Sequence, residues 1–135
     1  MKAEAGQRRP AARPPVPFAQ SALRHQPGAV VHRTLCRGDG GSVTLFAIAD
    51  DEIIPEHQTP NDEVLWVLDG TIELMLEGRP RRLEKGEMCH IPPHTLHRVR
   101  GIRNGRILLA ILRNPGRGRP RAVADDLPSS RRFTP

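Results

Sequence analysis

The stretches IPEHQTPNDEVLWVLDG (residues 54–70) and KGEMCHIPPHTLHRV (residues 85–99) decide how this chain folds. In both, short apolar runs are bounded by proline, glycine, asparagine or aspartate, a pattern that predicts short strands between turns. Neither stretch repeats its apolar residues at the spacing of an amphipathic helix. The same stretches contain most of the histidines of the chain, so they bear on its chemistry as well as on its fold.

The segments next to these stretches have the two-residue period of a β-strand. In TIELMLE (residues 71–77), Ile72, Leu74 and Leu76 share one parity, which predicts a strand that is buried on one face. Three other segments are apolar at nearly every position and predict strands covered on both faces: residues 42–49, 64–68 and 106–112. For residues 64–68 (VLWVL), the second cover would be another sheet or a partner subunit.

Turn signals that contain glycine separate the predicted strands: residues 38–41, Asp69-Gly70, Glu77-Gly78, Lys85-Gly86 and Asn104-Gly105. The Asn-Gly pair is typical of a type I′ hairpin turn, because both central residues of that turn need a positive φ. No internal segment has a helical pattern, and no internal repeat is visible. Many short strands between regular turns predict an all-β fold, an antiparallel sandwich or barrel.

The two ends of the chain differ in composition from its middle. The sequence has 135 residues, a formal net charge of +6 and 14 prolines; most of the prolines and all of the excess positive charge lie in residues 1–28 and 114–135. Proline lacks the amide donor and fixes its own φ, so the ends predict disordered or extended basic tails around one folded domain, residues 29–113. The tails show no recognition-helix pattern and no interleaved aromatic residues, which disfavours nucleic-acid binding.

Cysteine content and hydropathy favour one compartment. Cys36 and Cys89 stand far apart and form neither a CxxC motif nor a disulfide framework, which favours a reduced, cytoplasmic setting. No apolar run approaches the roughly 18 residues of a spanning helix, and no secretory signal is visible, so we expect no membrane association. An uncovered strand as apolar as VLWVL would promote aggregation, and we therefore expect a homodimer that buries it.

Two groups of residues resemble the two sequence motifs of the cupin superfamily. The first motif, a histidine pair followed by glutamate and glycine, is matched at His57, Glu63 and Gly70. The second motif, in which a proline-glycine turn precedes a histidine, is matched at Pro92 and His97. The resemblance covers most of the predicted folded domain. It implies a small single-domain, RmlC-like cupin, whose fold is an antiparallel jelly-roll β-barrel.

The resemblance also implies a divalent metal held by His57, Glu63 and His97. Thr59 stands where the family has its second histidine, and His94 where it has the glycine of the turn. Thr59 would then position a water molecule in the open corner of the site, and His94 is a candidate to replace the missing imidazole. Two imidazole nitrogens and one carboxylate oxygen suit iron, manganese, nickel, copper or zinc without choosing among them.

The strand period is compatible with this set. Positions 57, 59 and 63 share one parity, so we expect them on one face, and Asp62 on the other. A carboxylate such as Glu63 between apolar neighbours is costly to bury without a metal, a cation or hydrogen bonds. The alternative is that both histidines are ordinary polar residues at the barrel mouth, with Glu63 bonded to an arginine or to Thr59.

For three further residues we expect a structural role rather than a catalytic or metal-binding one. His90 has the parity of Pro92 and His94 and is expected at the surface or an interface rather than in the site. Cys89 has no clear base beside it and is expected to be a buried small apolar residue. Trp66, of opposite parity to Glu63, is expected to pack or to contact a second subunit.

Two functions from different classes remain. The first is a metal-dependent enzyme that acts on a small organic molecule inside the barrel, with oxygenase, isomerase and lyase chemistry all open. The second is a non-catalytic module that binds or senses a small ligand, with weak or absent metal. Retention of Glu63 favours the first, and Thr59 in place of a histidine favours the second. The predicted interior is apolar, as most small-molecule sites are, and it does not identify the ligand.

Overall fold

Seven antiparallel β-strands and no helix make up residues 23–114, the part of the chain that the structure, a computed structural model, describes. In chain order the strands are β1 (Val30–Gly38), β2 (Gly41–Ile48), β3 (Ile53–His57), β4 (Asp62–Leu76), β5 (Arg79–Glu84), β6 (Met88–Ile91) and β7 (His97–Leu112). The predicted all-β antiparallel fold is confirmed. The predicted tails lie largely outside the described residues, so their state and the domain bounds 29–113 stay predictions.

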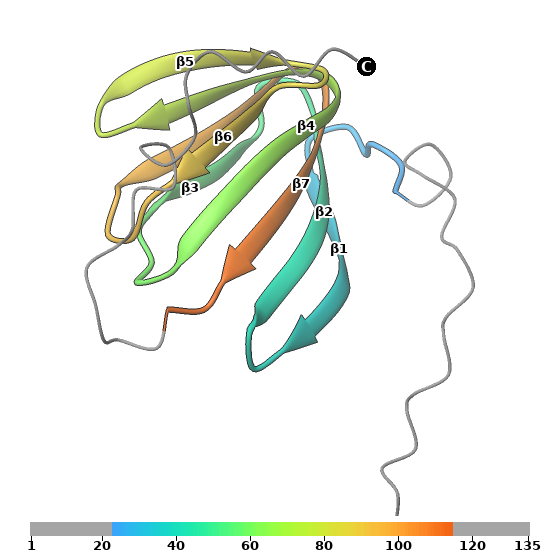
Figure 1. Cartoon of the computed structure of the whole chain (residues 1–135). Coiled ribbons are helices and arrows are strands. Elements are labelled where there is room, and N and C mark those ends of the chain that lie inside the picture. The colour runs from blue at the N-terminus through green and yellow to red at the C-terminus, as the bar shows by residue number, and fades with distance from the viewer. Residues whose placement is uncertain (1–22, 115–135) are drawn as a thin grey trace, which may run out of the picture.

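The strands β4 and β7 form the centre of the fold and pair along their whole length, from Asp62 opposite Leu112 to Leu76 opposite His97. Figure 1 shows them crossing the middle of the molecule, β4 in green and β7 in orange. The first half of β4 also pairs with β6 and its second half with β5. The second half of β7 pairs with β2 and its first half with β3. The two long strands therefore contribute to both layers of the barrel.

The predictions of turns at Asp69-Gly70 and Asn104-Gly105 are wrong. Both pairs lie inside a long strand, β4 or β7, in the region where the pairing of these strands shifts register. The positive φ that these residues signalled is present, 68° at Gly70 and 45° at Asn104. It bends a continuous strand, as a β-bulge does, instead of ending it. These bends let each strand pass from one layer to the other.

The other predicted turns are confirmed. Residues 39–40, 77–78 and 85–86 connect β1 to β2, β4 to β5 and β5 to β6. Glu77 and Gly78 have φ values of 47° and 76°, as the two central residues of a type I′ turn require. This tight turn leaves β4 and β5 in an unbroken register.

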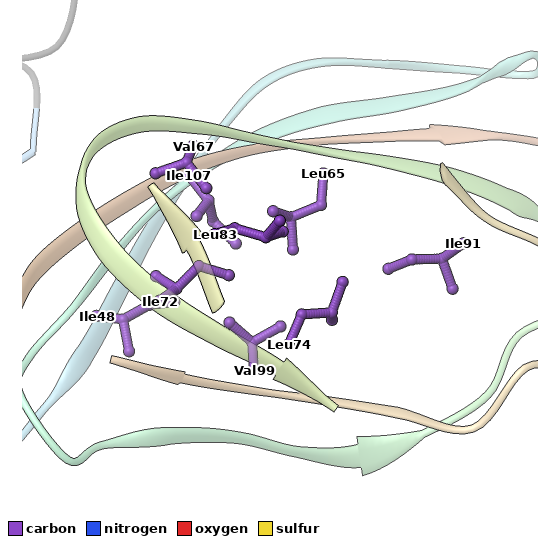
Figure 2. Packing of buried hydrophobic residues seen from close by; sticks show 9 residues of the cluster. All are labelled: Ile48, Leu65, Val67, Ile72, Leu74, Leu83, Ile91, Val99 and Ile107. Carbon is purple, nitrogen blue, oxygen red and sulfur yellow. The ribbon is translucent and has the colours of Figure 1, made fainter. Parts of the chain in front are cut away.

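The hydrophobic core lies between the two layers. Its buried members are drawn in Figure 2: Ile48, Leu65, Val67, Ile72, Leu74, Leu83, Ile91, Val99 and Ile107. Ile91 lies at one end of this cluster (Figure 2) and is the register partner of Glu63. The apolar core therefore stops where the polar residues of the first motif begin.

The outer face of β4 is covered only in part. Leu68 is buried and lines a small crevice together with Leu23 and Leu45. Trp66, in contrast, is 38% exposed, and its register partner Met88 is 62% exposed. In the single chain, the outer face of residues 64–68 is thus covered at Leu68, as expected, but not at Trp66. No helix in the described range, residues 23–114, could cross a membrane.

Candidate metal centre

The fold brings together His57, Glu63 and His97, the three residues that sequence motifs singled out. His57 ends β3 and is the register partner of His97, which begins β7. Glu63 lies near the start of β4, in the opposite layer, where it pairs with Ile91 of β6. One ligand atom from each of the three lies within 4.8 Å of the other two. The three residues therefore meet across the barrel. The expectation that one strand presents His57 and Glu63 on the same face is wrong, because β3 ends at His57 and Glu63 belongs to β4.

Backbone carbonyl groups fix both imidazoles. Nδ1 of His57 lies 2.8 Å from the carbonyl oxygen of Pro55, and Nδ1 of His97 lies 2.8 Å from that of Thr95. A carbonyl oxygen only accepts, so each Nδ1 carries the proton and donates it. In a neutral ring this leaves the lone pair on Nε2, which is the state that binds a metal. The two ring centroids are 4.2 Å apart.

The contact between Glu63 and His97 fits a bound cation. Oε2 of Glu63 lies 3.0 Å from Nε2 of His97, and the two side chains are only 2% and 3% exposed. Among the described residues, this buried oxygen has no hydrogen-bond partner. Two lone pairs at this separation repel unless a proton or a metal ion lies between them. Ligands bound at right angles to a metal, at about 2.1 Å each, are about 3 Å apart.

The surroundings of His97 shift its protonation. Burial by itself lowers the pKa of the imidazole, because it disfavours the charged form. The carboxylate of Glu63 and the carbonyl group of Thr95 act in the opposite direction and raise the pKa of His97 above its usual value of 6.5. A proton on Nε2 would therefore compete with a metal ion bound there.

Thr59 and His94 are not members of the metal-type group. Oγ1 of Thr59 accepts a hydrogen bond from the amide of Asn61 at 3.2 Å and lies 3.4 Å from its carbonyl oxygen, within a local turn. The amide of His94 donates to the carbonyl oxygen of Thr59 at 2.7 Å, and the His94 side chain is exposed. In residues 23–114, no fourth histidine, cysteine or carboxylate belongs to the metal-type group. The roles expected for Thr59 and His94 stay predictions.

The alternative partners considered for Glu63 are not found in the described residues. No arginine forms an ion pair with Glu63, and the Thr59 hydroxyl bonds to Asn61 instead. Its carboxylate faces only His97 as an ionisable partner at salt-bridge distance. The site thus combines an unsatisfied carboxylate oxygen with imidazole nitrogens available for a ligand.

A contact between a histidine and a carboxylate, His90 and Asp62, lies outside this site, and it was not predicted from the sequence. Nε2 of His90 lies 2.7 Å from Oδ1 of Asp62, on the face of β4 and β6 opposite to Glu63. This contact depends on the register of β6 on β4, which no local sequence pattern determines.

Cys89 is partly buried, and burial raises the pKa of its thiol while the charge of Arg81 opposes that rise. A raised pKa fits the expected packing role of Cys89 better than that of a nucleophile.

Comparisons with known proteins agree with this architecture. A family model described as the cupin domain matches residues 44–110. Among solved structures, a cupin superfamily protein from Desulfitobacterium hafniense is similar with a TM-score of 0.70 and 22% identity, over 76% of this chain and 94% of that one. An RmlC-like cupin from Desulfovibrio desulfuricans is similar with a TM-score of 0.66 and 18% identity, over 74% and 97%.

A third similar structure is the DMSP lyase DddQ from Ruegeria pomeroyi, with a TM-score of 0.59 and 23% identity, over 66% of this chain and 49% of that one. At such identities the likeness establishes the fold alone. A comparison with curated proteins finds no match for the sequence.

Proposed function

Because the chain belongs to the cupin superfamily, we propose that it binds a divalent transition metal through His57, Glu63 and His97 and acts on a small organic molecule inside its barrel. One observation carries the proposal: a buried carboxylate oxygen without a hydrogen bond lies 3.0 Å from the imidazole nitrogen of His97. A cation between these atoms would satisfy both. The second imidazole, His57, would complete the ligand set.

The donor set suits several metals. Two neutral nitrogens and one carboxylate are compatible with iron, manganese, nickel, copper or zinc. Three protein ligands leave coordination positions for water or a ligand, as catalytic sites do. A bound metal would polarise an oxygen atom of the substrate or activate water or dioxygen.

The residues of the chain have clear tasks in such a site. The carbonyl groups of Pro55 and Thr95 hold the imidazoles with Nε2 available, so that little rearrangement is needed on binding. Ile91 and Leu65 line the core side and exclude water from Glu63. His57 is half-buried, whereas Glu63 and His97 are buried, so a ligand would enter on the side of His57.

The reaction class stays open. The donor set is compatible with oxygenase, isomerase and lyase chemistry alike. A similar structure is that of a DMSP lyase, which makes a lyase one reasonable candidate. Fold likeness at this level of identity does not carry the substrate across.

A second candidate is a non-catalytic module that binds or senses a small ligand. Thr59 favours it, because this residue replaces an imidazole of the family and its hydroxyl is engaged with Asn61. Such a site would hold its metal weakly. In this reading the same barrel interior would bind a ligand without turning it over.

We also propose a cytoplasmic homodimer. The support is the exposed pair of Trp66 and Met88 on the outer face of β4 and β6, which a second copy of the chain would cover. Light scattering of the purified protein measures the mass of the particle. A monomer at micromolar concentration would contradict this proposal.

The metal content of the purified full chain tests the main proposal. We expect the wild type to hold close to one equivalent of iron, manganese, nickel, copper or zinc, and the His57→Ala, His97→Ala double variant to hold almost none. His90→Ala removes a histidine outside the site and is the matched control. Equal metal content in the wild type and the double variant would contradict metal binding at this site.

Turnover separates the two candidate functions. Once metal is shown, incubation of the loaded protein with pools of small organic molecules, followed by mass spectrometry, detects conversion. Conversion by the wild type and not by the double variant supports the enzyme. Saturable binding without conversion supports the sensing module.

A further inference from the structure

Two exposed arginines of β5, Arg79 and Arg81, lie on the strand face that continues into the barrel core. Leu83 of β5 is part of the core and pairs with Ile72 without any register shift between β4 and β5. Alternate residues of a strand share a face, so Arg81 and Arg79 share the face of Leu83, although their side chains are exposed and so lie at the rim rather than within the core. Arg82 lies between Arg81 and Leu83 in sequence and belongs to the outer face.

The register places these arginines in line with the candidate metal centre. Arg79 pairs with Leu76, which pairs with His97, which in turn pairs with His57. Two residues further along β5, Arg81 is the register partner of the buried Leu74 of β4. Neighbouring strands are about 4.8 Å apart, so the backbones of Arg79 and His97 are separated by about 10 Å. A small ligand together with an arginine side chain can span that separation.

The charge of Arg81 acts on the opposite layer. Cys89 of β6 pairs with the fully buried Leu65 and so shares its inner face. The positive charge of Arg81 lowers the pKa of the Cys89 thiol against the larger effect of burial. Figure 1 shows β5 and β6 on the same side of the barrel as β3, away from β1 and β2. The charge of Arg81 on β5 is thus close enough to β6 to act on the Cys89 thiol.

Within residues 23–114, two arginines of the outer face have carboxylate partners, whereas Arg79 and Arg81 have none, as is also true of Arg33, Arg37, Arg98 and Arg103. Arg100 pairs with Glu73 and Asp51, and Arg82 lies 4.0 Å from Glu84. In residues 23–114, no carboxylate lies within salt-bridge distance of Arg79 or Arg81. Two exposed guanidinium groups without a carboxylate partner, on the strand face that continues into the core, are suited to an anion, since arginine binds carboxylate and phosphate groups in a bidentate manner.

We propose that the ligand of the metal centre is a small organic anion whose carboxylate or phosphate group is bound by Arg81, with support from Arg79, while its other end reaches the ligand set of His57, Glu63 and His97. This inference rests on the proposed function, because it assigns the charge of the molecule that the same site would take. It makes Arg81 a residue that determines specificity.

Binding of two matched probes tests the assignment. Isothermal titration calorimetry is carried out on the full chain, with the metal that it retains, using succinate and its monoamide succinamate. We expect the wild type to bind succinate at least tenfold more tightly than succinamate. Arg81→Gln should abolish this preference, whereas Arg82→Gln on the outer face of the same strand should keep it. A third probe, 3-phosphonopropionate, decides whether a carboxylate or a phosphate-type group is preferred.

Each outcome bears on the proposal. A wild type without preference for the dianions, or an Arg81→Gln variant that keeps the preference, overturns it. Circular dichroism and metal content are measured on every variant, so a loss through misfolding or lost metal is recognised. If the wild type holds no metal, the proposed metal centre fails; the charge preference is then measured on the metal-free protein, and its presence there still supports an anion site at Arg81.

Discussion

Glu63 and His97 lie 3.0 Å apart, oxygen to nitrogen, both almost fully buried, yet no group in residues 23–114 forms a hydrogen bond with this Glu63 oxygen. They come from opposite layers of the barrel, so no local sequence requirement places them together. A buried carboxylate in this situation is costly unless a proton or a metal ion is shared with the imidazole. The pair therefore makes the candidate metal centre testable by several independent measurements.

Replacing the carboxylate should remove the effect of metal on stability. At a metal concentration of about 100 times the Kd, the wild type should be stabilised by about 2.7 kcal/mol. Glu63→Gln should lose most of this gain, because the amide is a poor ligand. Glu73→Gln, on the same strand and paired with Arg100 instead, is the control and should keep it. Thermal unfolding with and without metal measures the difference, and an unchanged gain in Glu63→Gln would contradict the assignment.

Stability and metal affinity should respond to pH in opposite directions. In the metal-free protein the raised pKa of His97 means that its ion pair with Glu63 contributes fully below about pH 6.5 and is lost as pH rises through the folded-state pKa. A metal needs the deprotonated nitrogen, so its affinity should weaken as pH falls through the same pKa. Denaturant unfolding after chelation, and metal titration of the same samples, measure the two trends. Both should vanish in His97→Gln; parallel trends would speak against competition at Nε2.

The bend of β4 should tolerate no side chain at Gly70. A Cβ there would lie 2.1 Å from the carbonyl oxygen of Arg103 and 2.3 Å from that of Asn104, at a φ of 68°. Gly70→Ala should therefore destabilise the fold by about 3 kcal/mol or more, since backbone would have to move. Gly78→Ala is the matched control, with a φ of 76° and nothing within 4 Å, and should cost about 1 kcal/mol. Urea unfolding compares the two, and equal costs would show that the bend is not tightly packed.

The Cys89 thiol reports on the position of Arg81. Because the guanidinium charge lowers the pKa of this thiol, Arg81→Gln should raise that pKa further and reduce the thiolate fraction at a given pH. Alkylation by iodoacetamide should slow accordingly. The measurement uses a Cys36→Ser background, since Cys36 is exposed. Arg82→Gln should leave the rate unchanged; an equal effect of both variants would place Arg81 away from Cys89.

Much of the fold could be predicted from the sequence, because the two-residue period and the turn residues act locally. The alternation in residues 71–77 and the apolar run 106–112 both correspond to strand segments. The turns at Gly70 and Asn104 were predicted wrongly, because a positive φ serves a bulge inside a strand as well as a hairpin. Which of the two occurs depends on whether the flanking segments pair with each other or with a common partner.

The candidate site was predictable only in part. Motif spacing identified His57, Glu63 and His97, which the structure brings together. The placement of Arg81 on the strand face of Leu83 was not predicted, although the parity of RPRRLE was visible, because the face of β5 is defined only by the pairing of Leu83 with Ile72. Long-range register decides such placements, and a one-residue slip would move every side chain to the other face.

The bent pair of β4 and β7 has a consequence for how the two ends of the same ladder meet. Glu63 lies at one end of this ladder and His97 at the other, yet the bends of the two strands at Gly70 and Asn104 allow the atoms Oε2 and Nε2 to lie 3.0 Å apart. The bends lie in the middle of the strand pair, and the two candidate metal ligands lie at its ends. The angle of the bend therefore sets the distance between Glu63 and His97. A substitution that widens this angle should weaken metal binding although it changes none of the candidate ligands.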